Sequence, residues 1–255
     1  MSDISQNKRD ALFAEPLAQI SDFCFDEQVV EVFPDMINRS IPGYQTILHT
    51  LSKLTARYAQ PNTKLYDLGC SLGAATMAMR KGCEQLSGCE IVGVDNSAAM
   101  IKRCRLHLDG FKSSVPVHLQ CEPIQQTKIQ NASVVVVNFT LQFVPKPERL
   151  EVLKHIYAGL EPGGVLILSE KVIGAHQTGD ALLVDLHHDF KRANGYSDLE
   201  ISQKRAAIEN VMRIDSLEEH QQRLAAAGFV DTQVWFQCFN FLSLVAVKPT
   251  QRDPQ

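Results

Sequence analysis

Residues 64–73 constrain the fold of this 255-residue chain more than any other stretch. A short apolar run carries Asp67, and Gly69 and Gly73 then bracket a small polar turn that leads into strong helix formers. This order predicts a strand, a tight turn and the start of a helix. The glycines can adopt positive φ and allow a ligand to approach the backbone closely. Free N–H groups at the helix start favour polar or anionic ligand groups, and we expect the Asp67 carboxylate to face a cation such as an amino group.

A second acid follows at the end of the next predicted strand. Residues 90–95 form an apolar run that ends in Asp95, with Asn96 and Ser97 in capping position. An acid at this point commonly binds the two ribose hydroxyls of an adenosine ligand. The turn is not the dinucleotide fingerprint G-x-G-x-x-G, and no phosphate-binding lysine follows it. Its D-x-G-x-x-x-G pattern resembles motif I of the class I S-adenosylmethionine-dependent methyltransferases; the alternative is a generic α/β turn without a ligand.

Hydrophobic periodicity predicts the rest of an α/β sheet. Further strands are expected at residues 115–120, 132–139, 165–170, 229–236 and 241–247, and helices at 45–58, 98–108, 147–160 and 216–227. A valine run before Asn138 is typical of a strand buried on both faces. Asn138 lies at the carboxyl end of this strand, where ligands bind in such sheets. The L-x-P-G-G turn at residues 160–164 is typical of class I methyltransferases. We predict their Rossmann-like fold, with a seven-stranded, mostly parallel sheet and helices on both faces.

The predicted organisation is a single S-adenosylmethionine-binding domain over residues 31–250. An N-terminal arm, residues 1–30, precedes it and carries Phe13, Phe23 and Phe25. These aromatic residues suggest a cover over the active site, and a loosely ordered terminus is the alternative. A helical insertion at about residues 174–214 follows the fifth strand.

Composition narrows the classes of function. The net charge of −4 argues against a surface that binds nucleic acid directly. We find no apolar run that would span a bilayer and no signal peptide, so we expect no membrane association and a cytoplasmic location. The seven cysteines are scattered without C-x-x-C pairs, which favours free thiols over disulfides or a zinc site.

The insertion carries the remaining candidate site residues. Lys191, Arg192, Lys204 and Arg205 form a basic patch beside the expected pocket, which is either a solvated helix face or a site for a carboxylated substrate. The adjacent residues His187 and His188 cannot share one helix face as metal ligands do at i, i+4. We expect them to have a capping or packing role and predict no metal site.

Several longer strings resemble one family within this fold, the bacterial carboxy-S-adenosyl-L-methionine synthases. They are residues 25–26 (FD), 38–44 (NRSIPGY), 66–73 (YDLGCSLG), 189–197 (DFKRANGYS), 200–205 (EISQKR) and 235–241 (WFQCFNF). The resemblance extends over essentially the whole chain.

The resemblance implies a reaction without methyl transfer. The family uses prephenate as the carboxyl donor to S-adenosylmethionine, yielding carboxy-S-adenosyl-L-methionine and phenylpyruvate. The product serves a partner enzyme that modifies the wobble uridine of certain tRNAs, and the family is homodimeric. No catalytic protein base is assigned, because the hydroxide leaving prephenate can take the methyl proton.

The resemblance also implies the ligand contacts. Those to S-adenosylmethionine correspond to Tyr44, Gly69, Cys70, Ser71, Asp95, Asn96, Pro123, Ile124 and Asn138, and the carboxylate-binding arginine corresponds to Arg205. Pro123 departs from the family pattern, in which an aspartate is expected, and this affects the adenine contact. Three alternatives stay open: an ordinary small-molecule methyltransferase, a non-catalytic S-adenosylmethionine-binding subunit, and a tRNA-binding enzyme, the last disfavoured by the charge.

Overall fold

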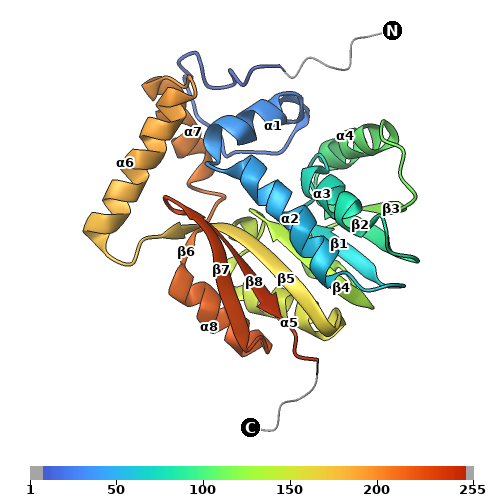
Figure 1. The fold of residues 1–255 in the computed structure, drawn as a ribbon. Coiled ribbons are helices and arrows are strands. Elements are labelled where there is room, and N and C mark those ends of the chain that lie inside the picture. The colour runs from blue at the N-terminus through green and yellow to red at the C-terminus, as the bar shows by residue number, and fades with distance from the viewer. Residues whose placement is uncertain (1–7, 251–255) are drawn as a thin grey trace.

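The computed structural model describes residues 8–250, and its core is one mixed α/β sheet (Figure 1). The strand order is β3-β2-β1-β4-β5-β8-β7, with the short β6 paired to β5. The five strands from β3 to β5 pair in parallel, whereas β8 is antiparallel to both β5 and β7. The predicted fold, including the seven main strands, is confirmed. The strands are β1 (Lys64–Leu68), β2 (Glu90–Asp95), β3 (Val117–Cys121), β4 (Ala132–Asn138), β5 (Leu160–Ile173), β6 (Asp215–Ser216), β7 (Asp231–Cys238) and β8 (Phe241–Val247).

Helices cover both faces of the sheet. The helices are α1 (Glu27–Ser40), α2 (Tyr44–Tyr58), α3 (Ala74–Cys83), α4 (Ala98–Asp109), α5 (Arg149–Gly159), α6 (Gln177–Ala193), α7 (Asp198–Ile208) and α8 (Leu217–Ala227). The strand residues alternate between two apolar clusters, as period-2 strands require. Leu65 and Val134 pack with α2 and α3 on one face, and Tyr66 and Val135 pack with α5 and α8 on the other.

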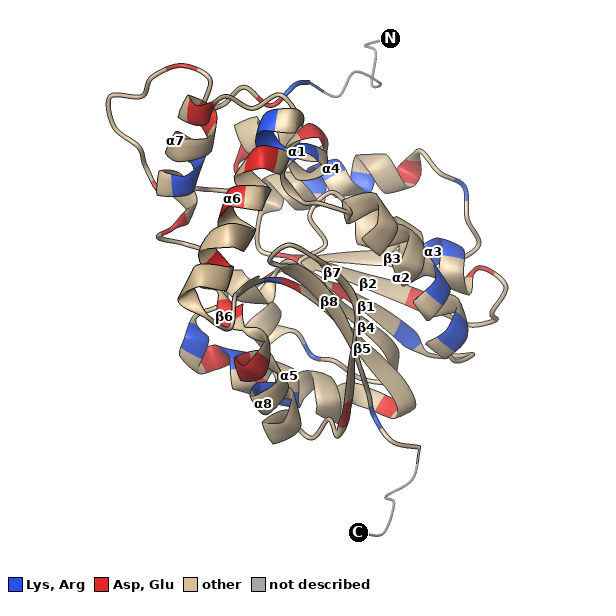
Figure 2. Cartoon of the chain, turned by 60° about the vertical axis from the view of Figure 1, so that its left-hand side comes forward, with Lys and Arg blue, Asp and Glu red and all other residues tan. Residues whose placement is uncertain are grey.

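Figure 2 shows charged residues mainly on the helices, in loops and at the strand ends, with few along the middle of the sheet. The central valines of β4 are fully buried, as the sequence pattern predicted. No helix among residues 8–250 is long and apolar enough to cross a membrane.

Several boundaries differ from the sequence-based expectations. The fifth strand begins at Leu160 rather than at residue 165, because the turn that contains Gly163 (φ 76°) continues in strand pairing. The helix expected from residue 147 begins as a 3₁₀ turn at Lys146–Glu148, and α5 starts at Arg149. The mixed apolar and acidic stretch after Asp26 forms α1, for which the sequence analysis predicted no helix.

The insertion forms α6 and α7, which lie with α1 at one end of the sheet (Figure 1). Asp26 caps α1 by accepting from the Gln28 and Val29 amides, and Ser197 opens α7 with a capping box. These three helices and the described part of the arm stand beyond the carboxyl ends of the parallel strands. Residues 1–7 of the arm lie outside the described part of the chain.

Candidate active site

A cavity of about 1110 Å³ opens at the carboxyl ends of the parallel strands. This position is where doubly wound sheets bind ligands, and the volume lies just above the range of about 300–1,000 Å³ for small-molecule sites. All ten residues proposed from the sequence line its wall: Tyr44, Gly69, Cys70, Ser71, Asp95, Asn96, Pro123, Ile124, Asn138 and Arg205. The structure therefore brings them together, and their contacts with a ligand stay predictions.

The turn after β1 is held by its own hydrogen bonds. The Gly69 and Cys70 amides donate to the Val94 carbonyl oxygen at 2.7 and 2.9 Å, and the Gly73 amide donates to the Cys70 carbonyl oxygen at 2.8 Å. The Ser71 amide donates to Asp95 Oδ2 at 2.9 Å. These four amides are therefore not free for a ligand. The expectation of free N–H groups concerned the helix start, where Ala74 and Ala75 line the cavity, and it stays a prediction.

The two glycines of this turn are required by φ and by packing. Gly69 has φ 84°, and a Cβ there would lie 2.1 Å from Thr140 Oγ1. Gly73 has φ 85°, and a Cβ there would lie 2.8 Å from Cys104 Sγ. The space that each missing side chain leaves is thus filled by the protein, so these glycines shape the cavity wall indirectly.

The two acids of the turn have different roles. Asp67 is fully buried and does not line the cavity, and its Oδ2 accepts from Thr76 Oγ1 at 2.5 Å. Burial raises the Asp67 pKa to about 6, opposed by the Thr76 hydrogen bond. Asp67 Oδ1 is buried without a hydrogen-bond partner in the described chain, so the expected contact between Asp67 and a ligand amino group stays a prediction. Asp95 does line the cavity, and burial also raises its pKa.

The wall after β4 is positioned by a buried acid. Glu170, from β5, accepts hydrogen bonds from the Leu141 and Gln142 amides at 2.9 Å each. Burial raises the Glu170 pKa to about 8. Asn138 lies just before this loop, and its Oδ1 is buried without a hydrogen-bond partner in the described chain. An unpaired buried oxygen at a cavity wall fits a site that receives a hydrogen-bond donor from a ligand.

The N-terminal arm and α6–α7 close the other side of the cavity. Phe23 and Phe25 line it, and the Phe25 and Phe143 rings meet edge to face at 5.4 Å between centroids. Phe23 and Phe25 therefore lie at the cavity wall, whereas Phe13 does not line it, and the role of the arm as a cover stays a prediction.

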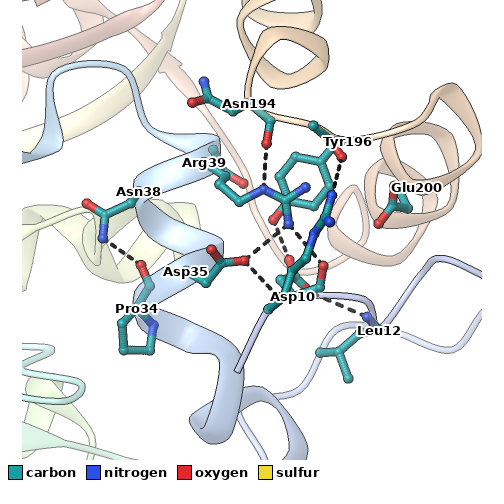
Figure 3. Close-up of polar contacts among 12 residues, drawn as sticks. Asp10, Leu12, Pro34, Asp35, Asn38, Arg39, Asn194, Tyr196 and Glu200 are labelled. Carbon is teal, nitrogen blue, oxygen red and sulfur yellow. Dashed lines mark hydrogen bonds and ion pairs between the residues drawn. The ribbon is translucent and has the colours of Figure 1, made fainter. Parts of the chain in front are cut away.

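A polar network ties this arm to α1 and to the loop between α6 and α7 (Figure 3). Arg39 Nε donates to the Asn194 carbonyl oxygen at 2.7 Å, and Arg39 Nη1 donates to the Asp10 carbonyl oxygen at 3.0 Å and to Asp35 Oδ2 at 3.1 Å. The Tyr196 hydroxyl donates to the Asp10 carboxylate, and the Arg39 guanidinium stacks 3.7 Å from the Tyr196 ring centroid. The network fixes three chain segments that are far apart in sequence.

Only part of the basic patch expected in the insertion lies at the cavity. Lys191, Lys204 and Arg205 line the cavity, whereas Arg192 is exposed and pairs with Asp189 and Asp198 at 2.7 and 2.8 Å. The placement of Arg192 beside the pocket was wrong, because its position on α6 directs it to these acids. Sequence reasoning missed Lys171, which also lines the cavity. Its position near the carboxyl end of β5 was the available signal.

His187 packs within the protein. Its Nε2 is 2.8 Å from the Ser40 carbonyl oxygen, and its ring lies edge to face with Phe241 at 4.8 Å. Burial lowers the His187 pKa to about 2, so the ring is neutral. Within residues 8–250, no group of three or more His, Cys, Asp or Glu side chains gathers as metal ligands do.

Solved structures share this architecture at low sequence identity. An O-methyltransferase family protein from Burkholderia thailandensis matches with a TM-score of 0.61 at 16% identity, covering 89% of this chain and 61% of that chain. Human N-acetylserotonin methyltransferase, solved in complex with S-adenosylmethionine, matches with a TM-score of 0.60 at 16% identity, covering 88% and 56%. A family model described as a methyltransferase domain matches residues 66–166. The fold is thus that of the class I S-adenosylmethionine-dependent methyltransferases.

Curated relatives narrow this class. A protein from Idiomarina loihiensis is 61% identical over 94% of this chain and 99% of its own length, and one from Aeromonas salmonicida is 60% identical over 96% and 99%. Both are named carboxy-S-adenosyl-L-methionine synthase. The chain belongs to the carboxy-S-adenosyl-L-methionine synthase family and is a transferase.

Proposed function

We propose that the protein transfers a carboxyl group from prephenate to the methyl carbon of S-adenosylmethionine, forming carboxy-S-adenosyl-L-methionine and phenylpyruvate. The observation that carries this proposal is the identity of 60–61% over nearly the full chain to proteins named for that product. The cationic side chains that line one end of the cavity support it, because the donor is anionic.

S-adenosylmethionine would lie across the carboxyl ends of β3, β2, β1 and β4. Asp95 would accept hydrogen bonds from the ribose hydroxyls, and Pro123 and Ile124 would flank the adenine. Asn138 Oδ1 would accept a hydrogen bond from the amino-acid part of S-adenosylmethionine. Tyr44, Asn96 and the residues 69–71 would complete the wall. Because neighbouring strands are about 4.8 Å apart, the three steps from β2 through β1 and β4 to β5 place Asp95 about 14 Å from Lys171. This span leaves room for a donor at the β5 end.

The chemistry needs no protein base. Prephenate loses carbon dioxide and hydroxide as its ring becomes aromatic, giving phenylpyruvate. The hydroxide removes a proton from the sulfonium methyl group and becomes water, and the resulting methylene carbon forms a bond to the carbon dioxide. The protein would contribute positioning and exclusion of water, and a positioned pair of reactants can gain about 7–11 kcal/mol.

Arg205 would bind the new carboxylate. It is exposed, and its Nε donates to Glu209 Oε1 at 2.5 Å, while the guanidinium carries further N–H donors that a substrate carboxylate can meet. Arg205→Ala should therefore slow carboxylation, with Arg192→Ala as a matched control at a residue that does not line the cavity. An Arg205→Ala variant as fast as the wild type would remove Arg205 from the mechanism.

We also propose a homodimer, a cytoplasmic location and use of the product by a separate tRNA-modifying enzyme, without direct nucleic-acid binding by this chain. Leu182 and Leu186, one turn apart on α6, are 58% and 36% exposed, which supports contact with a second copy through α6. Light scattering of wild type and Leu182→Asp tests this proposal, since a dimer built on α6 should dissociate in the variant.

The direct test of function is mass spectrometry of the small molecule released from purified protein, before and after addition of S-adenosylmethionine and prephenate. The proposal predicts a product heavier than S-adenosylmethionine by one carbon dioxide. Transfer of a methyl group to an added acceptor would indicate an ordinary methyltransferase. Tight S-adenosylmethionine binding without turnover would indicate a non-catalytic subunit.

A further inference from the structure

Four cationic side chains line the end of the cavity formed by β5, α6 and α7: Lys171, Lys191, Lys204 and Arg205. Two of them have acidic partners. Lys204 Nζ lies 3.4 Å from Asp10 Oδ2, and Arg205 pairs with Glu209. Within residues 8–250, neither Lys171 nor Lys191 makes an ion pair within 4.0 Å. Two ammonium groups are thus available to a ligand.

These two lysines are in an environment that disfavours their charge. Both are half-buried. Burial, together with the nearby charges of Lys204, Lys171 and Arg205, lowers the Lys191 pKa to about 7. Burial likewise lowers the Lys171 pKa, with Arg205 adding to the effect and Asp180 and Glu209 opposing it. Grouped cations with no bound anion are costly, and an anionic ligand offsets that cost.

We propose that Lys171 and Lys191 form an anion subsite, distinct from Arg205, that binds the carboxylate the donor keeps. This inference rests on the proposed function. Prephenate carries two carboxylates: the ring carboxylate leaves as carbon dioxide, and the keto-acid carboxylate stays in phenylpyruvate.

We assign the two lysines to the retained carboxylate because the two carboxylates of prephenate differ in how their charge changes during the reaction. The departing carboxylate loses its charge as it becomes carbon dioxide, so cations that hold it tightly stabilise the ground state and oppose the reaction. The retained carboxylate keeps its charge throughout, so contacts to it stabilise the ground state and the transition state equally. Loss of such contacts raises KM and leaves kcat unchanged.

The experiment measures kcat and KM for prephenate, the inhibition constant of phenylpyruvate and the dissociation constant of S-adenosylmethionine in Lys191→Met and Lys171→Met. Phenylpyruvate carries only the retained carboxylate. Because a hydrogen bond to a charged group contributes about 1.5–3 kcal/mol, we expect KM and the inhibition constant to rise together by about tenfold or more in each variant. The value of kcat and the affinity for S-adenosylmethionine should stay near wild type, and Lys191→Arg should restore part of the donor affinity.

Arg192→Met is the matched control, because this residue follows Lys191 and pairs with acids away from the cavity. Unchanged phenylpyruvate inhibition in both lysine variants would overturn the inference. A fall in kcat with KM unchanged would also overturn it, since that result places the lysines at the reacting atoms. If the wild type makes no product from prephenate, the proposed function fails. In that case, calorimetric titration of phenylpyruvate into S-adenosylmethionine-loaded wild type and lysine variants still tests the anion subsite, which predicts weaker phenylpyruvate binding in the variants.

Discussion

The buried side chain of Glu170 holds the loop after β4 in the cavity wall, and its raised pKa can be tested. Its carboxylate is fully buried and accepts the Leu141 and Gln142 amides, and so fixes the loop that follows Asn138. Burial raises its pKa from 4.5 to about 8, although the Arg149 charge and the two amide hydrogen bonds oppose the shift. The perturbation is Glu170→Gln, which keeps the shape and removes the titration.

The magnitude follows from proton linkage. Because the folded pKa lies above the unfolded value, the folded state binds more protons between pH 4.5 and 8. The contribution of Glu170 to stability is therefore fully present below pH 4.5 and is lost as the pH rises through about 8. At about 1.4 kcal/mol for each pKa unit, the free energy of unfolding should fall by about 4 kcal/mol between about pH 5 and about pH 9 from this group alone.

Urea unfolding of wild type and Glu170→Gln across this pH range measures the effect. The variant replaces one acceptor oxygen with a donor, at a cost of about 1–3 kcal/mol that does not depend on pH. We therefore compare the slopes: the stability difference between the two proteins should shift by about 4 kcal/mol in favour of the variant from about pH 5 to about pH 9. A difference that stays constant with pH would refute the raised pKa.

Three further predictions concern the cavity. Asp95→Ala should weaken S-adenosylmethionine binding by about tenfold or more, because charge-assisted hydrogen bonds to the ribose are lost; an unchanged dissociation constant in calorimetry would contradict the ribose assignment. Gly69→Ala should lower the free energy of unfolding by more than the about 1–3 kcal/mol that strain at positive φ costs, because its Cβ would also overlap Thr140; urea unfolding measures this loss. Gly179→Ala is its control, since a Cβ there meets nothing within 4 Å. Phe25→Ala should open the cavity and let carbon dioxide escape before transfer, seen as less carboxylated product for each phenylpyruvate released; equal yields of the two would argue against Phe25 as a cover.

Much of the fold followed from local pattern. The strands could be predicted from the valines of β4 and from the apolar runs that carry Asp67 and Asp95, because strands buried on both faces need such runs. The helix expected at residues 216–227 was also predictable: α8 runs from Leu217 to Ala227, with Ser216 as its N-cap and Gly228 at φ 114° after its end. Helix α1 was not, because Pro34 and mixed acidic residues obscure its apolar face.

The site was predictable where residues follow strand ends, and less so where partners come from distant segments. The positions of Asp95 and Asn138 followed from sheet topology. Lys191 and Arg192 are adjacent on α6, but Lys191 lines the cavity whereas Arg192 pairs with Asp189 and Asp198. In the turn after β1, the amides of residues 69–71 donate hydrogen bonds to Val94 and Asp95. The contacts with Val94 and Asp95 join segments distant in sequence and carry no local signal, whereas Asp189 is an i,i+3 neighbour of Arg192 on α6.

The most direct test of the account uses prephenate labelled with ¹³C in its ring carboxylate, S-adenosylmethionine and the wild-type protein, with excess unlabelled bicarbonate in solution. Mass spectrometry then reads the isotope in the product. The account predicts carboxy-S-adenosyl-L-methionine that retains the label, formed in equal amount with phenylpyruvate, because the carbon dioxide is captured inside the cavity. Product carrying unlabelled carbon, or phenylpyruvate released without carboxylated product, would contradict carboxyl transfer within this site.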